Sequence, residues 1–439
     1  MSDELLRAAE LAISHAKKLG MDEAEAAVHR GTGVAVTARQ QELETVEKHN
    51  DAQIVISVYK DNKTGSASSA DLTENGIKDT VRAAASIADH TGADECFGLA
   101  DKELMANQPL ELDLYHPWVK EVAALADIAL ECEQAALQYD PRITNSEGAS
   151  VNSYSGEAAY GNSHGFMSTA RGSQHSLSAA VIGSTEQGMQ RDYWYDSNRN
   201  AEKLATAQSI GQEAARRTIR RLDARKIPST QAPVLFEPGM AKSLVGHLVG
   251  ALKGGAIYKK ASFMLDRVGE SILPDAISIT ESPHKPGASN SAWHDNEGVA
   301  TPAQRAIVDE GVLQGYVLGS YTARKLKLQS TANAGGVRNL EVSDTGHSFT
   351  ELLKEMDSGL LVTELIGSGI NMVSGDYSRG AAGFWVEHGE IQYPVEEITI
   401  AGNLLEMYQN IVAVGTDRDQ RGNTECGSIL LRNMTIAGA

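Results

Sequence analysis

One short segment of the chain holds most of the residue types from which a catalytic or metal site could be built. It begins at Pro238, whose ring suits the first turn of a helix, and its apolar residues then recur at helical spacing. Ser243, His247 and Gly250 fall on another face of this helix, where small residues would let a second group approach. Taken alone, His247 is interpreted as a hydrogen-bonded structural residue, with a metal ligand or a base as the alternative.

The usual catalytic motifs are absent from the sequence. No His-Glu pair occurs, which excludes the common helical zinc-protease motif, and no phosphate-binding glycine loop opens a helix. A G-x-S-x-G string at residues 161–165 has no helical pattern after it, so we predict a hairpin turn and not a nucleophilic serine. Cys96, Cys132 and Cys426 are far apart and odd in number, which fits neither a disulfide framework nor a paired thiolate zinc site.

Long strings in the second half of the chain resemble blocks of one protein family. The helix that contains Gly246-His247 is followed by four strings: Arg267-Val268-Gly269-Glu270, Asp295-Asn296-Glu297-Gly298-Val299, Ser374-Gly375-Asp376-Tyr377-Ser378-Arg379-Gly380-Ala381 and Gly383-Phe384-Trp385-Val386-Glu387-His388-Gly389-Glu390-Ile391. On these strings the chain is similar to the TldD/TldE (PmbA) family of metalloproteases, also labelled modulators of DNA gyrase. The similarity covers most of residues 233–439, and residues before 233 match more loosely.

The resemblance implies that a metal site has been lost from this chain. In zinc-binding members the helix is similar to H-E-x-x-x-H, in which two histidines hold zinc and the glutamate activates water. Here Lys242 replaces the first histidine and Ser243 the glutamate, so that only His247 remains. A lysine ammonium repels the metal ion, and a serine cannot replace a carboxylate base.

A third ligand of the family is a cysteine near the C-terminus, and Cys426 matches its position. His247 and Cys426 would then be two candidate ligands, whereas zinc needs at least three from the protein. We therefore expect no catalytic residue and no cofactor in this chain, and zinc in a TldD-like partner subunit. The other interpretation of Cys426 is a small apolar residue of the core.

Two of the similar strings contain candidates for binding a peptide or a partner. These candidates are Asp295, Glu297 and Gly298 in the first string, and Gly375, Asp376, Ser378, Arg379 and Gly380 in the second. The first string could equally be a solvated turn, and the second could make a tight turn beside a subunit interface. The family resemblance implies unfolded peptides as substrates, which could bind by strand addition with little side-chain selectivity.

Charge and hydropathy limit the possible partners. The net charge is -19, which repels nucleic acids. Six basic residues close together are predicted to be the solvated end of a helix: Arg216, Arg217, Arg220, Arg221, Arg225 and Lys226. The N-terminal segment is an amphipathic helix pattern, and no apolar run reaches the ~18 residues of a membrane span. We therefore expect a cytoplasmic protein that binds neither nucleic acid nor membrane.

The elements that must position these residues are predicted from periodicity. Helical patterns occupy residues 2–20, 72–88, 116–138 and 201–222, with antiparallel strands between them and turns at residues 31–33 and 61–65. After a linker at residues 223–233, short strands predominate, for example at residues 307–318 and 384–391. We predict an α+β fold with two domains: an N-terminal domain of helices and antiparallel meanders over residues 1–227, and a mostly β domain with the degenerate metal-site helix over residues 228–439.

Three functions are compatible with these observations. The chain could be the non-metal-binding half of a heteromeric protease, which matures peptide precursors or degrades an antitoxin. It could instead be a metallopeptidase that is active by itself as a homodimer, although no base or full ligand set is found. It could also be a protein-binding regulator without a proteolytic role. A homodimer is also possible when the isolated chain lacks its partner.

Overall fold

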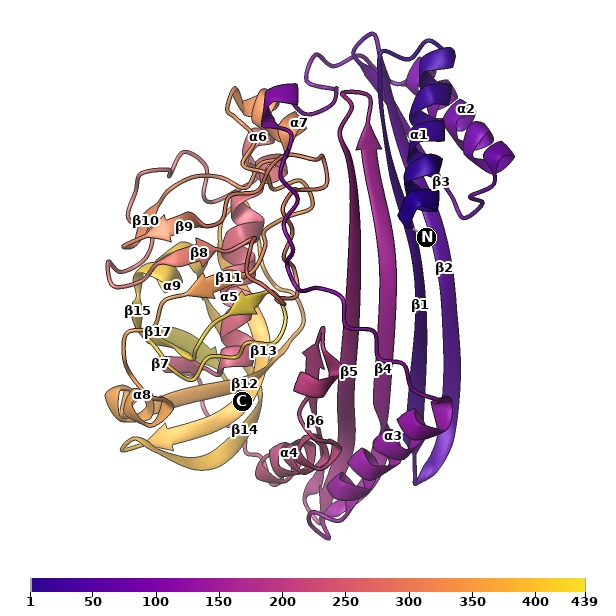
Figure 1. Cartoon of the computed structure of the whole chain (residues 1–439). Coiled ribbons are helices and arrows are strands. Elements are labelled where there is room, and N and C mark those ends of the chain that lie inside the picture. The colour runs from indigo at the N-terminus through magenta and orange to yellow at the C-terminus, as the bar shows by residue number, and fades with distance from the viewer. Residues whose placement is uncertain (1, 439) are drawn as a thin grey trace.

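The structure is a computed structural model that describes residues 2–438, and it confirms the α+β class (Figure 1). The elements up to Arg220 build one large antiparallel sheet with helices on it, which we call the N-terminal layer. Those from Thr230 onward build two further sheets, which we call the C-terminal layer. The domain boundary at residue 228 stays a prediction.

The sheet of the N-terminal layer has the strand order β3-β2-β1-β4-β5-β6. All neighbouring strands are antiparallel. The strands are β1 (Glu23–Arg39), β2 (Glu42–Lys60), β3 (Lys63–Ser69), β4 (Ile143–Asn162), β5 (Met167–Thr185) and β6 (Gly188–Asn198). Four of the six are far longer than the usual strand of ~5–6 residues, so the sheet is a tall wall along one side of the molecule (Figure 1).

Four helices cover the two ends of this sheet: α1 (Ser2–Lys18), α2 (Glu74–His90), α3 (Val122–Leu137) and α4 (Ala207–Arg220). Val28 of β1 packs in the core beneath α1 and α2, and Val36 packs beneath α3 and α4. Residues separated by an even number along a strand share a face, so both helix pairs cover the same face of the sheet. The opposite face is thereby left for the C-terminal layer.

The turns of the first hairpins differ in part from the prediction. The prediction of a turn at residues 31–33 is wrong, because β1 continues through these residues. The chain turns at Gln40 and Gln41, both of which have positive φ. A Cβ on Gly31 would lie 1.8 Å from the Tyr154 hydroxyl, so close packing against β4 requires this glycine. The turn at Asp61 and Asn62 and the hairpin at residues 161–165 are confirmed.

Two predicted helices begin later in the chain than expected. The helix expected from residue 116 begins at Val122, because the preceding segment is extended and bonded to both layers. The Ser173 amide donates to the Leu114 carbonyl, and the Gly287 amide donates to Leu112. The helix expected from residue 201 begins at Ala207, after the 3₁₀ turn η2 (Ala201–Lys203). A second 3₁₀ turn, η1 (Lys102–Leu104), lies at the top of the segment between α2 and α3 (Figure 1).

The C-terminal layer contains a six-stranded and a five-stranded sheet. The first has the order β14-β13-β12-β7-β17-β15, and pairing of β14 with β17 closes five of its strands into a ring. Its strands are β7 (Thr230–Phe236), β12 (Gly359–Ile366), β13 (Asp376–Glu387), β14 (Glu390–Asn403), β15 (Ile411–Val414) and β17 (Ile429–Ala437). The second has the strands β8 (Ile279–Glu281), β9 (Arg305–Asp309), β10 (Val312–Leu313), β11 (Leu340–Val342) and β16 (Thr424–Glu425).

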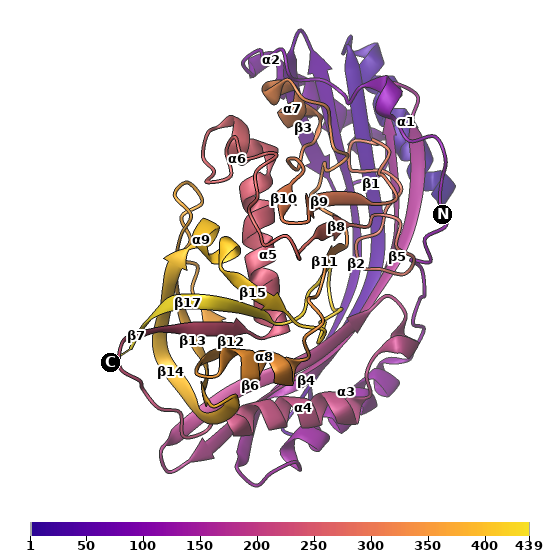
Figure 2. The ribbon, with the colours of Figure 1, turned by 90° about the vertical axis from the view of Figure 1, so that its left-hand side faces the viewer.

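The helices of the C-terminal layer are mostly short. They are α5 (Pro238–Leu252), α6 (Gly254–Tyr258), α7 (Ser320–Leu326), α8 (Phe349–Met356) and α9 (Leu404–Gln409). Only α5 is long, and Figure 2 shows it running through the middle of this layer. Its apolar residues belong to the largest core cluster, together with side chains from β7, β12 and β17.

The basic cluster at the end of α4 is only partly solvated: Arg216, Arg225 and Lys226 are exposed as predicted, whereas Arg217, Arg220 and Arg221 are buried or half-buried. Arg217 is only 6% exposed, and its guanidinium donates to both carboxylate oxygens of Glu237 at 2.9 and 3.1 Å. Arg220 reaches the same carboxylate at 3.4 Å. Because Glu237 is the residue before α5, the cluster joins the N-terminal layer to the helix that carries the candidate site. In the described part of the chain, no helix is long and apolar enough to cross a membrane.

Candidate functional site

Helix α5 is positioned by its ends and by its apolar stripe. Pro238 occupies its first turn, where a missing amide hydrogen costs nothing, and Lys253 in extended conformation ends it. Leu244, Leu248 and Leu252 are all at most 1% exposed. With this stripe fixed in the core, the faces carrying Lys242 and His247 are fixed as well.

Lys242 is held by two groups of a loop near the C-terminus. Its Nζ lies 3.0 Å from Oδ2 of Asp419 and donates to the carbonyl of Arg421 at 2.5 Å. Burial lowers the pKa of Lys242, and the charge of Asp419 opposes that shift. Burial alone would raise the pKa of Asp419, but hydrogen bonds from Arg421 and the charge of Lys242 hold it below its ordinary value. The pair is thus an internal ion pair with an ammonium in it.

Arg421 extends this network to the N-terminal layer. Its guanidinium donates to both oxygens of Asp419 at 2.9 and 3.0 Å, and to the Tyr195 carbonyl at 2.8 Å. It also stacks 3.9 Å from the ring centre of Trp194 on β6. A planar guanidinium can form a forked carboxylate bond and a cation–π contact together, which a lysine could not do. Lys242 therefore belongs to a set of contacts that spans both layers.

Ser243 and Cys426 are both in structural roles. The Ser243 hydroxyl donates to the Met240 carbonyl at 2.6 Å, one turn back in the same helix. Cys426 is fully buried, and its thiol donates to the Gly427 carbonyl at 3.2 Å. Burial raises the pKa of Cys426 to about 12, so the thiol holds its proton at neutral pH.

His247 faces another group of polar side chains. Its ring lies 6.1 Å from that of Tyr377, edge to face, and its Nε2 has no hydrogen-bond partner among the described residues. Burial lowers the pKa of His247, and the charge of Arg379 lowers it further, so the ring is neutral at neutral pH. The structure thus places His247 beside Tyr377 and Arg379, and Lys242 beside Asp419.

The donors around α5 do not fit a catalytic zinc site. At the position of the first histidine, Lys242 is an ammonium paired with Asp419. At the position of the glutamate, the Ser243 hydroxyl is bonded to its own helix. In the C-terminal loop, the thiol of Cys426 is protonated. Among residues 2–438, no cluster of three or more His, Cys, Asp or Glu side chains could hold a metal ion. A zinc hydrolase needs three ligands and a group that accepts the proton of water.

The segment with Gly375 to Gly380 forms a built turn and the start of β13. Gly375 has a φ of +83°, and its carbonyl accepts from Leu404. Asp376 accepts from the Ser374 hydroxyl at 2.6 Å, and the Ser378 amide donates to Gly369 at 2.7 Å. Arg379 and Gly380 pair with β14. These internal bonds leave less free backbone for an extended peptide than the sequence suggested, and a binding role for the segment stays a prediction.

Asp295, Glu297 and Gly298 organise a loop of the C-terminal layer against the large sheet. Asp295 accepts from the amides of Glu297, Val299 and Ala334 at 2.9 to 3.0 Å. Glu297 accepts from the first amide of α7 at 2.8 Å. Gly298 has a φ of +81°, and a Cβ there would meet the Phe166 ring at 2.8 Å.

Burial raises the pKa of Asp295 to about 6, and the nearby charge of Glu297 adds to this shift. Asp295 is 1% exposed, and its three amide contacts oppose the shift without cancelling it. Functional sites often contain a carboxyl group with a raised pKa next to a cavity. Because the Asp295 carboxylate accepts hydrogen bonds from three backbone amides, it also fixes the conformation of the loop.

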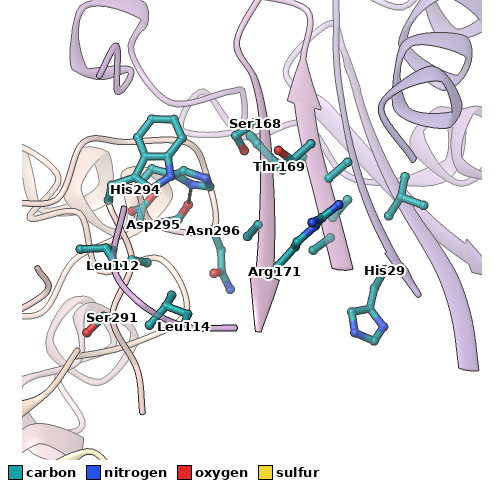
Figure 3. Close-up of a pocket in the computed structure, with 18 of the residues that line it drawn as sticks. His29, Leu112, Leu114, Ser168, Thr169, Arg171, Ser291, His294, Asp295 and Asn296 are labelled. Atoms are coloured by element: carbon teal, nitrogen blue, oxygen red, sulfur yellow. Dashed lines mark hydrogen bonds between the residues drawn. The ribbon is translucent and has the colours of Figure 1, made fainter. Parts of the chain in front are cut away.

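A cavity of about 1000 Å³ lies where this loop faces the sheet. Its walls come from β1, β2, β4 and β5, from the extended segment before α3, and from the loop of residues 291–296. Figure 3 shows His294, Asp295 and Asn296 on one side and Ser168 and Thr169 on the strands opposite. Of the predicted site residues, only Asp295 lines this cavity, which is a separate place from the side chains around α5.

Several residues of these sites could not be predicted from sequence patterns. Asp419 and Arg421 lie far along the chain from Lys242, and Asp-x-Arg is too common a string to be noticed. Arg338, which lines the cavity, belongs to no motif. A close-packed glycine such as Gly298 was found, because its string resembles a family block.

Comparison with known proteins identifies the class and then the family. The chain is similar to metallopeptidases along nearly its whole length: family models of PmbA/TldA metallopeptidases match as domain 1 at residues 24–88, as the central domain at residues 115–222 and as the C-terminal domain at residues 229–438. The chain belongs to the PmbA/TldD family of metallopeptidases.

Individual relatives agree with this assignment. The chain is 49% identical to the metalloprotease PmbA of Escherichia coli O157:H7, over 95% of this chain and 92% of that protein. It is 46% identical to a PmbA homologue of Haemophilus influenzae, over 99% and 96% of the two chains. A solved structure from Bacteroides thetaiotaomicron, called a modulator of DNA gyrase, has a TM-score of 0.93 at 27% identity, covering 99% of this chain and 98% of that one.

Proposed function

We propose that this chain is the non-metal-binding subunit of a heteromeric TldD/TldE-type metalloprotease that acts on unfolded peptides. A TldD-like partner subunit would hold the zinc and cleave the peptide. This chain would complete the enclosed site and help to hold the substrate. Maturation of peptide precursors and degradation of an antitoxin are the kinds of reaction that the family resemblance suggests.

The observation that carries the proposal is the ion pair of Lys242 with Asp419 at 3.0 Å. A cation fixed by the protein occupies the place where a zinc-binding relative would have a histidine. Removing it would leave Asp419 and Arg421 in place, and neither Ser243 nor Cys426 is ionised to replace the missing ligand and base. These contacts support the proposal that the zinc and the water-activating base come from the partner subunit.

An exposed edge of the large sheet supports association with another protein. Strand β3 pairs only with Ile54 to Lys60 of β2, so the preceding part of β2 has no neighbour on that side among the described residues. Residues 42–51 are exposed throughout, including Leu43 and Val46 at 49% and 40%. Free strand edges are templates for pairing, and soluble proteins usually cover them.

Small side chains on β4 and β5 support binding of an extended peptide. Both strands are rich in Ser, Gly and Ala, which leaves room above the sheet face that the helices do not cover. A peptide held mainly through its main chain would be accepted with little regard to its side chains. An enzyme for unfolded substrates requires such tolerance.

A mixing experiment tests the proposal. Cleavage of an unfolded peptide is measured for this chain, for a TldD-like zinc subunit and for their mixture, with zinc determined in each sample. We expect stoichiometric zinc only in samples that contain the partner, and the fastest cleavage in the mixture. Chelator-sensitive cleavage by this chain alone would favour the self-sufficient peptidase instead. A mixture that forms no complex and gains no activity would favour a regulator.

A further inference from the structure

The cavity between the two layers contains a buried cation that the rest of the protein leaves without a partner. Arg338 is 8% exposed and lines the cavity. Its Nε has no hydrogen-bond partner, and no carboxylate among residues 2–438 lies within ion-pair distance of its guanidinium. A buried arginine is normally paired, because an unpaired buried charge is strongly destabilising.

The acidic groups nearest to Arg338 are already engaged. Glu281 accepts from the Arg338 amide at 2.7 Å and from the Asn333 side chain at 2.8 Å. Asp295 is 1% exposed, and its carboxylate already accepts three backbone amides. Neither carboxylate therefore forms a direct bond to the guanidinium, although both lie close enough to influence it.

The other arginine that lines the cavity differs from Arg338. The guanidinium of Arg171 lies 3.0 Å from Glu157 and over the ring of Tyr115. Its charge is therefore balanced by the protein. Arg338 is the cation in the cavity whose charge a ligand would have to balance.

The surroundings of Arg338 indicate the size and polarity of that ligand. The sheet wall has small side chains, including Ala27, Ala158 and Ser168, and one aromatic ring, Tyr160 on β4, whereas Trp293 supplies aromatic surface from the loop opposite. Volumes of ~300–1,000 Å³ are typical of pockets for small molecules and short peptides. The cavity thus has room for a few residues of extended chain next to the cation.

We propose that this cavity binds the C-terminal carboxylate of a short peptide, with Arg338 as the residue that recognises it. An arginine fork matches a carboxylate through two parallel hydrogen bonds. A phosphate would bring two charges next to Asp295 and Glu281 in a chain of net charge -19, so a single carboxylate fits better. The inference rests on the proposed function for the identity of the ligand as a peptide, and assigns to this chain the end of the peptide that it holds.

Calorimetric titration of the full isolated chain tests the assignment. The probes are N-acetyl-trialanine with a free carboxylate, the same peptide as its C-terminal amide, N-acetyl-Ala-Asp-Ala amide, and inorganic phosphate. We expect the free acid to bind on the order of 10-fold to 100-fold more tightly than either amide, since charge-assisted bonds are lost. Tryptophan fluorescence offers a second readout, because Trp293 lines the cavity.

Variants connect the preference to the residue. Arg338→Gln is expected to abolish the difference between acid and amide, and Arg338→Lys to retain part of it, because the charge stays and the fork is lost. Arg30→Gln is the control, since Arg30 pairs with Glu4 at 2.9 Å outside the cavity. If Arg338→Gln does not fold, Ala158→Leu narrows the cavity without touching Arg338 and should weaken binding of the free acid.

Each outcome decides the matter. Equal binding of acid and amide, tighter binding of phosphate or of the aspartyl peptide, or a preference that survives in Arg338→Gln and in Ala158→Leu would overturn the inference. These titrations need neither zinc nor a partner. If the chain shows no preference for the free carboxylate but stimulates a zinc subunit, the inference is wrong and the proposed function stands. If the chain prefers the free carboxylate but does not stimulate a zinc subunit, only the proposed function is wrong.

Discussion

At the scale of single residues, Lys242 shows how one substitution changes the chemistry of a helix and also its stability. The ammonium is largely buried, pairs with Asp419 at 3.0 Å and also donates to a backbone carbonyl. The groups that contact it, a carboxylate and a carbonyl oxygen, both stabilise a positive charge. The position is thus part of the fold and would not accept a metal ligand by exchange of one side chain.

Replacement of this lysine tests its structural role. Lys242→Met keeps the length of the side chain but leaves Asp419 with Arg421 as its remaining partner. We expect the free energy of unfolding to fall by about 1–2 kcal/mol, measured by urea denaturation. In the double variant with Asp419→Asn, the loss of unfolding free energy should be about 1 kcal/mol smaller than the sum of the losses in the two single variants. Strict additivity would show that the pair contributes nothing.

Asp295 gives a pH-dependent prediction. Its pKa is raised to about 6 in the folded chain, whereas an unfolded aspartate has an ordinary value of 3.8. The folded state therefore binds the proton more tightly, and the stability from this proton is present below pH ~4 and lost as the pH rises through 6.

Asp295→Asn removes this dependence. The stability of the natural chain minus that of the variant should decrease by about 2–3 kcal/mol between pH 4 and pH 6, measured from urea midpoints. Above pH 7 the two curves should run parallel, since the carboxyl no longer titrates there. A constant difference across the whole range would contradict the raised pKa.

At the scale of elements, the contact of α4 with the start of α5 couples the two layers. The fork between Arg217 and Glu237 joins them, and Arg217 also lies 4.9 Å from the ring centre of Trp194. The six clustered cations suggested only a solvated helix end. Their partner Glu237 is separated from them by a linker, and a buried fork of this kind leaves no periodic pattern in the sequence.

Glu237→Gln tests the coupling between the layers. We expect a loss of about 1–2 kcal/mol, because Arg217 keeps Asp192 as a second carboxylate at 3.6 Å. Calorimetry should also show a broader transition, as the layers unfold less cooperatively. Lys226→Gln is the matched control. Its pair with Glu397 is exposed, so its removal should change stability by less than about 0.5 kcal/mol.

Local patterns predicted the kind of each element better than its ends. The α+β class, the α5 helix and the hairpin at residues 161–165 follow from periodicity and turn chemistry. The false turn at Gly31 and the late start of α3 at Val122 have another cause. Gly31 makes room for Tyr154 on a strand far along the chain, and the segment before α3 is extended because it bonds to both layers. Such long-range contacts override local preference.

The residues of the candidate sites were also predictable only where a local pattern in the sequence marks them. Lys242, Ser243 and His247 could be found because they lie in one helix that resembles a family motif, and Cys426 because its string resembles a family block. The cavity with Arg338 could not be found, because its walls come from four strands, an extended segment and a loop that only the tertiary fold brings together.

At the scale of the whole molecule, one long strand of the tall sheet, β2, has a first half that the chain itself does not cover. Residues 42–51 of β2 are exposed, and Leu43 and Val46 share one face of the sheet, because a bulge between them places Leu43 opposite Ala38 and Val46 opposite Val36. Several of the surrounding residues are acidic, which keeps the edge soluble. A partner that added a strand here would bury both apolar side chains and satisfy the free backbone groups.

Leu43→Lys together with Val46→Lys tests this surface. Because both side chains are exposed, we expect the isolated chain to lose less than about 1 kcal/mol of stability. Loss of the apolar burial should weaken association with a TldD-like zinc subunit by on the order of 10-fold or more, measured by titration calorimetry and by the activity of the mixture. Ile391→Lys is the control, because Ile391 is exposed to a similar extent, 43%, on β14 of the other layer. If the control weakened association and the double variant did not, the partner would bind the C-terminal layer, and the exposed part of β2 would have no part in assembly.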